Sequence, residues 1–303
     1  MKKIIVVVLL LLLISCTLDS KIDLIASEKV TYLPFVTTFK KEVGIVTESP
    51  ISSYWYNPNT AIKFSVRGAD VLNSPYYDNW LKSDNIIEGY NAKIIVVTTA
   101  PGWMAKDNII CKLPKFEYVY RYKEFIQDVI DRYKPTYIEI WNEPDIRYEA
   151  MPPEHAYFYG CIGDGKEYGE FTDYIKNNVT GAKILIGSLA NPYTPFISDM
   201  LVGDYDGISF HCYNRFYGVL YGNCVLDYKQ VKLYTNKEVL LTETAVLYRS
   251  GLESKYEEAQ IIHYKQLKEL NTFYWYTLCG NGWPIEMPTD LCKRPVFNYY
   301  KRE

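Results

Sequence analysis

The chain has 303 residues, and 33 lysines and arginines stand against 36 aspartates and glutamates, which gives a formal net charge of −3 at pH 7. Such mild acidity argues against nucleic-acid binding, because that function needs clustered basic surface. The length suits a short leader followed by one α/β barrel, whose usual size is about 250 residues.

The N-terminus has the layout of a secretory signal. Two lysines precede an unbroken apolar run over residues 4–14, which is too short to span a bilayer comfortably, since a transmembrane helix needs about 20 apolar residues. Leu13-Ile14-Ser15-Cys16 resembles a bacterial lipoprotein box. This resemblance implies that residues 1–15 are a signal peptide, that Cys16 carries an acyl anchor in a lipid bilayer, and that the protein is exported to the cell surface or periplasm. An ordinary signal peptide cut elsewhere is the alternative. We expect residues 16–40 to be a tether and N-terminal extension.

From about residue 42, short β-branched or apolar runs alternate with amphipathic segments, which is the pattern of repeated βα units and a parallel sheet. Eight runs are candidate strands, at residues 43–47, 62–67, 93–98, 137–141, 183–187, 207–211, 238–242 and 272–276. Helical spacing is clearest at residues 115–133, 165–178, 195–202, 224–234 and 254–270. We therefore expect one domain, a (β/α)8 TIM barrel over residues 41–303, with a reduced first helix in 50–60 and a reduced last helix in 296–301.

Two of the predicted strands end in a glutamate. The fourth runs into Trp141-Asn142-Glu143-Pro144 and the seventh into Thr242-Glu243, so both carboxylates belong at the C-terminal face, where active sites of such barrels lie. Glycoside hydrolysis needs such a pair, because one carboxyl group must protonate the leaving oxygen while the other is ionised. The alternative is that each glutamate merely ends its strand and pairs with a nearby cation.

With these motifs the chain resembles the retaining glycoside hydrolases of clan A, a (β/α)8 superfamily that includes xylosidases, mannanases and cellulases. The resemblance implies that Glu143 is the acid/base, that Glu243 is the nucleophile, and that Asn142 hydrogen-bonds the sugar 2-hydroxyl. It implies a β-linked oligo- or polysaccharide substrate and no cofactor.

Four other predicted strand ends match the same superfamily. His211-Cys212-Tyr213 resembles its His-x-Tyr motif, in which the tyrosine hydroxyl donates to the nucleophilic carboxylate. The resemblance places Arg67 near the nucleophile, Trp275 on the floor of the sugar subsite, and Trp103 in a Pro-x-Trp loop. A core histidine, a structural ion pair and ordinary packing tryptophans are the competing interpretations.

The remaining cysteines indicate disulfides rather than a metal site. Apart from Cys16 there are six, an even number for an oxidising compartment, and six cysteines allow 15 pairings. Joining neighbours in the expected barrel pairs Cys111 with Cys161, Cys212 with Cys224, and Cys279 with Cys292. No CxxC or histidine-rich spacing supports metal ligation. We expect no metal and a monomer.

Two other functions remain open at this point. One is a surface carbohydrate-binding protein on a catalytically inactive barrel, because fold alone does not determine activity. The other is a transglycosylase, in which a sugar replaces water in intercepting the same intermediate.

Overall fold

The computed structural model describes residues 42–46, 61–73, 91–146, 160–193, 195–216, 220–247, 253–270 and 272–276. The chain divides into two units, Met1–Phe39 and Lys40–Glu303, and every described residue belongs to the second. The predicted leader, and the helices expected in residues 50–60 and 296–301, lie outside the described residues. Among the described helices, none is both long enough and apolar enough to cross a membrane.

Within the described residues, nine strands form one sheet. They are β1 (Glu42–Val46), β2 (Ala61–Arg67), β3 (Asn91–Thr98), β4 (Tyr137–Ile140), β5 (Lys183–Leu189), β6 (Gly207–Phe216), β7 (Leu220–Tyr221), β8 (Glu238–Leu247) and β9 (Thr272–Tyr276). Each of the eight strands predicted from the sequence overlaps one of these, and β7 was not predicted because two residues carry no periodicity.

The sheet is parallel and strongly curled. Its order is β5-β4-β3-β2-β1-β9-β8-β6-β7, and all neighbours run parallel except β7, which pairs antiparallel with the end of β6. Strands β5 and β6 stand far apart in this order and yet also pair in parallel, so the sheet bends back on itself. Parallel neighbours need crossover connections, which here are mostly helical.

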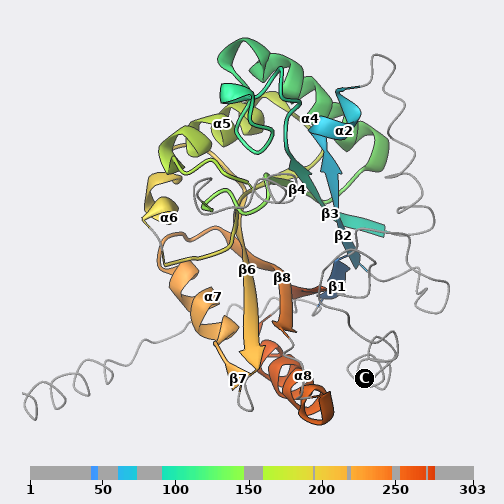
Figure 1. Ribbon diagram of the computed structural model, residues 1–303, viewed down its shortest axis with the longest axis vertical. Coiled ribbons are helices and arrows are strands. Elements are labelled where there is room, and N and C mark those ends of the chain that lie inside the picture. Colours follow the sequence, from blue (N-terminus) through green and yellow to red (C-terminus); the bar gives the residue numbers. More distant parts are fainter. Residues whose placement is uncertain are drawn as a thin grey trace, which may run out of the picture. The chain divides into compact units, whose positions relative to one another are not determined.

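Helices cover the outside of this sheet. They are α2 (Gly68–Val71), α4 (Val119–Tyr133), α5 (Gly165–Asn178), α6 (Phe196–Asp199), α7 (Cys224–Lys232) and α8 (Glu253–Leu267), with the 3-10 turns η3 (Lys106–Asn108) and η4 (Phe116–Tyr118). Helices α4 to α8 follow one another in chain order around the strands (Figure 1). The predicted helix at 195–202 is a single turn, α6, which packs so closely on α5 that a Cβ at Gly169 would lie 2.2 Å from the Met200 carbonyl oxygen.

The inside of the curled sheet is layered. A small apolar cluster contains Ala61, Ile94, Leu185, Leu240 and Tyr274, one residue from each of five strands. Side chains two residues apart on a strand share a face. The positions two residues further along β2 and β8 are therefore on the same face, and they are polar residues, Lys63 and Thr242. Polar side chains thus begin one layer above the apolar cluster.

Two buried tyrosines form hydrogen bonds with backbone groups at or near the ends of strands. Tyr168 of α5 donates its hydroxyl proton to the Ile140 carbonyl at the end of β4, and its oxygen accepts from the Gly187 N–H of β5 at 3.0 Å. Tyr122 of α4 donates to the Thr99 carbonyl at 2.9 Å. These hydroxyl groups form hydrogen bonds with backbone groups where the regular hydrogen bonding between strands ends or becomes irregular.

We expect Tyr168→Phe to lower the free energy of unfolding by about 1 to 3 kcal/mol, because it leaves the buried Gly187 N–H without the oxygen that it donates to. Urea unfolding followed by circular dichroism measures this change. The matched control is Tyr120→Phe on the exposed side of α4, for which we expect a change within about 0.5 kcal/mol. Equal effects of the two substitutions would contradict the role of Tyr168.

Candidate active site

The segment after β4 has an unusual backbone. Trp141 and Glu143 have φ values of 67° and 48°, in the left-handed region that residues other than glycine rarely adopt. The Trp141 ring is fully buried and its Nε1–H donates to the Cys111 carbonyl at 3.0 Å, while the Glu143 N–H donates to the Ser188 carbonyl at 3.0 Å. Such conformations persist where the surroundings fix them and cluster at functional sites. They hold Glu143 beside the end of β5.

A β-bulge aims Glu243 into the same region. In the pairing of β6 with β8, Phe210 faces Leu241 and the next residue, His211, faces Glu243, so Thr242 is the extra residue. An extra residue of this kind bends a strand and re-aims a side chain. Thr242 and Glu243 consequently both contact groups inside the sheet, although they are adjacent in the chain.

His211 lies between the two predicted catalytic carboxylates. Its Nδ1 is 2.9 Å from Glu143 Oε1 and 3.5 Å from Glu243 Oε2. The Tyr213 hydroxyl donates to the same Glu243 oxygen. The structure therefore brings together Glu143, Glu243, His211 and Tyr213. Both glutamates are almost buried, with 7% and 9% of their surface exposed.

The surroundings of Glu243 favour its ionised form. Burial alone would raise the pKa of this carboxyl, but His211, the Lys63 ammonium and the Tyr213 hydroxyl together lower the pKa below its ordinary value. Opposite charge and hydrogen bonds donated to a carboxylate both have this effect.

Lys63 belongs to this site, although the sequence did not predict it. It lies in β2, fully buried, with Nζ 2.6 Å from Glu139 Oε2, 3.2 Å from Glu243 Oε1 and 3.1 Å from His211 Nε2. Glu139 of β4 also accepts from the Thr242 hydroxyl at 2.7 Å. A charged residue inside an apolar strand run, as in Ile62-Lys63-Phe64, was the available signal.

Other predicted site residues lie at the ends of neighbouring strands. Asn142 Oδ1 is 3.4 Å from the Ser188 hydroxyl oxygen. Arg67 is the last residue of β2 and is partly exposed. Trp103, after β3, is 41% exposed, packs edge-on against Tyr118 and has the Arg121 guanidinium 5.1 Å from its ring centre. Trp275 lies in β9, but its side chain is outside the described part of the structure, as are Cys16, Cys279 and Cys292.

Two of the three expected disulfides lie within the described residues, and both are formed. Cys111 is bonded to Cys161 and Cys212 to Cys224, as the sequence predicted. The second bond ties the start of α7 to β6 at the residue between His211 and Tyr213.

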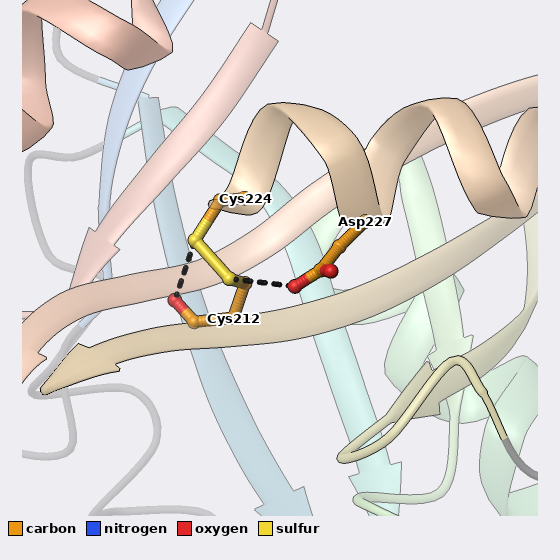
Figure 2. Close-up of side chains that lie close together, drawn as sticks. All are labelled: Cys212, Cys224 and Asp227. Carbon is orange, nitrogen blue, oxygen red and sulfur yellow. Dashed lines mark hydrogen bonds between the residues drawn. A yellow bond between two sulfur atoms is a disulfide. The ribbon is translucent and has the colours of Figure 1, made fainter. Parts of the chain in front are cut away.

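An aspartate lies against this second bond. One carboxylate oxygen of Asp227 is 3.1 Å from Cys212 Sγ (Figure 2). The candidate ligand atoms of Cys212, Cys224 and Asp227 lie within 4.8 Å of one another, but in this structure both sulfurs belong to the disulfide and neither is a thiolate. The group is therefore a cross-link beside the site.

A chain of buried side chains supports β6 and β8 from behind. Asn214 Nδ2 donates to His263 Nδ1 at 2.9 Å, which leaves the ring proton on Nε2, and that nitrogen is 2.8 Å from Thr244 Oγ1. Thr244 in turn donates to the Cys212 carbonyl at 2.9 Å. Burial lowers the pKa of His263 to about 4. The chain depends on a neutral imidazole, because only then does one ring nitrogen accept while the other donates.

The fold of this chain is similar to those of several solved structures. No protein-family model matches the sequence, and no curated protein matches it significantly. Among solved structures, the chain is similar to a conserved exported protein from Bacteroides fragilis (13% identity, TM-score 0.52, covering 77% of this chain and 64% of that one). It is also similar to a family 39 glycoside hydrolase from Bacteroides cellulosilyticus (14%, 0.51, covering 84% and 59%). A third is a broad-specificity endoglucanase from Ruminococcus champanellensis with bound cellotriose (10%, 0.53, covering 80% and 89%).

The chain spans less than two thirds of the first two proteins, 64% and 59% of their lengths. At these identities the likeness shows a common fold, which this chain shares with glycoside hydrolases.

We expect the free energy of unfolding to fall as the pH drops from about 6.5 towards 4, in part through His263. The pKa of His263 is about 4 in the folded chain and about 6.5 in the unfolded chain. Between these pH values His263 therefore binds a proton in the unfolded chain but stays neutral in the folded chain. The loss from this group reaches about 3 kcal/mol. Urea unfolding of the native protein and of His263→Gln at several pH values isolates it. The stability advantage of the native protein should shrink towards pH 4, and a constant difference would contradict the account.

Proposed function

We propose that the chain is a retaining glycoside hydrolase that cleaves β-glycosidic bonds with Glu143 and Glu243. The observation that carries the proposal is the approach of both carboxylates to one nitrogen of His211, at 2.9 and 3.5 Å. The two oxygens cannot be farther apart than the sum of these distances. This limit of about 6.4 Å for one pair of oxygens is compatible with the spacing of about 5 to 5.5 Å between the carboxyl groups of retaining enzymes.

The proposed reaction has two displacements. Glu243 attacks the anomeric carbon while the protonated Glu143 carboxyl donates to the departing oxygen, which yields a glycosyl ester on Glu243. Glu143 then removes a proton from water, the water oxygen attacks the anomeric carbon, and the ester bond to Glu243 breaks. Tyr213 and the Lys63 ammonium stabilise the anionic form of Glu243, and Asn142 hydrogen-bonds the sugar 2-hydroxyl.

The environments of the two glutamates suit different roles. Glu243 has an ammonium group and a phenol against its oxygens, which favour the anion. Glu143 contacts the His211 ring. Two residues further along the chain is Asp145, and burial raises the pKa of its carboxyl group to about 6. The acid/base therefore lies beside a second carboxyl group, and the nucleophile lies beside a cation.

The proposal extends to the whole chain. Residues 41–303 form a complete (β/α)8 barrel, with the first and last helices in 50–60 and 296–301, and Arg67, Trp103 and Trp275 line the sugar subsites. Residues 1–15 are a signal peptide, Cys16 carries the acyl anchor, and residues 16–40 are the tether of a monomer. The parallel, curled sheet supports the barrel, and the exported protein from Bacteroides fragilis is a structural neighbour that supports export.

Hydrolysis of a panel of aryl β-glycosides tests the proposal. We expect purified protein to hydrolyse at least one sugar and Glu243→Gln to lose at least about 1,000-fold in kcat/KM, because the amide is a poor nucleophile. Glu143→Gln should lose about 100- to 10,000-fold on poor leaving groups and far less on activated ones, which need no proton. The matched control, Glu117→Gln, changes an exposed glutamate and should be unaffected.

Other outcomes identify the alternatives. A carbohydrate-binding protein would release no sugar from aryl glycosides or polysaccharides and would keep its affinity in Glu243→Gln. A transglycosylase would release the aryl group but yield mainly a longer glycoside instead of the free sugar. Either result would overturn hydrolysis.

A further inference from the structure

Building on the proposed function, we propose that Lys63 is a positioning residue whose buried ammonium fixes the proton of His211 on Nδ1 and holds Glu243 in its anionic form. The resemblance to known hydrolases implied that Arg67 is the residue near the nucleophile Glu243. In the structure an ion pair with Glu243 comes from Lys63, four residues earlier on the same strand.

The surroundings of the ammonium determine what it does. Three acceptors from three other strands surround Lys63 Nζ: Glu139 of β4 at 2.6 Å, His211 of β6 at 3.1 Å and Glu243 of β8 at 3.2 Å. An ammonium group has three N–H donors and no acceptor. His211 Nε2 must therefore present its lone pair to Lys63, so the proton of the neutral ring is on Nδ1.

The other side of the ring leads to the same assignment. Nδ1 is 2.9 Å from Glu143 Oε1 and 3.5 Å from the Glu243 carboxylate. An Nδ1–H donates towards these oxygens, whereas a lone pair on Nδ1 would face the negative charge of Glu243. The Ser188 hydroxyl, 2.9 Å from Nε2, can also donate to that nitrogen. The opposite tautomer, or a doubly protonated ring, would place an Nε2–H against the ammonium.

Glu139 acts as the permanent counter-ion of Lys63. Burial alone would lower the pKa of this lysine, but Glu139 and Glu243 outweigh burial and raise the pKa, so the group stays charged. Glu243 loses its charge whenever it carries a glycosyl group, whereas Glu139 does not. The ammonium thus keeps a partner through the whole cycle, as a fully buried charge requires.

The test compares two variants of the full chain. Lys63→Met/Glu139→Gln removes the lysine together with its counter-ion, a replacement by neutral residues of similar size that proteins often tolerate. Glu139→Gln alone is the matched control, because it keeps Lys63 beside Glu243 and His211. Thermal unfolding checks that both variants fold.

The first readout is ¹⁵N NMR of the imidazole rings, which needs no substrate. The chain has three histidines, so His211→Gln and His263→Gln assign the signals. We expect His211 to be protonated on Nδ1 and bare on Nε2 in the native protein and in Glu139→Gln, and to lose that preference in the double variant. An Nε2–H tautomer in the native protein would overturn the proposal even if the double variant did not fold.

The second readout is the pH dependence of kcat/KM. We expect the acid limb of the kcat/KM profile to move to higher pH by about one unit or more in the double variant. Lys63→Arg keeps a cation at this position, so its acid limb should move less. An unchanged limb together with an unchanged His211 tautomer would reduce Lys63 to a packing residue. If the native protein hydrolyses no substrate, the proposed function fails, and the NMR result still decides what Lys63 does to His211.

Discussion

A lysine ammonium inside the curled sheet organises the polar interior of this protein. An unpaired charge there would cost many kcal/mol, so Lys63 is stable only because acceptors from β4, β6 and β8 converge on it. The same contacts limit where those acceptors can be. Glu243 is drawn against the ammonium, and His211 must turn Nε2 towards it, which aims the opposite nitrogen at the two glutamates. The Lys63 ammonium thus fixes the positions of both Glu243 and His211.

Backbone irregularity brings the glutamates to that interior. Glu143 follows β4 in a left-handed conformation, and Glu243 leaves the regular alternation of β8 through the bulge at Thr242. Neither arrangement is favourable by itself, and each is supported from outside the sheet. Tyr168 donates to the carbonyl at the end of β4, the His263 chain links β6 to β8, and the Cys212–Cys224 disulfide ties β6 to α7. The packing of the helices therefore supports the geometry of the site.

The sequence predicted the strands and four members of the site because strand ends of a parallel sheet meet at one edge. Glu143 and Glu243 each follow a β-branched or apolar run, and this position placed them together, whereas His211 and Tyr213 were predicted from the resemblance to the His-x-Tyr motif. Lys63 was not predicted because β2 alternates apolar and polar residues from Ile62 to Arg67, which is the pattern of a strand with one exposed face. A lysine there resembles a surface residue until three strands are seen around it. The bulge and the His263 contacts depend on pairings between segments far apart in the chain, which local periodicity does not report.

The proposed mechanism depends on a covalent bond between Glu243 and the sugar. Aryl glycosides with fluorine at carbon 2 and a good leaving group test it directly, because the fluorine destabilises the oxocarbenium-like transition state and slows hydrolysis of the ester more than its formation. Intact-protein and peptide mass spectrometry should find one glycosyl group per chain on the peptide that contains Glu243. Substrate turnover with no adduct, or an adduct on another carboxylate, would contradict the account.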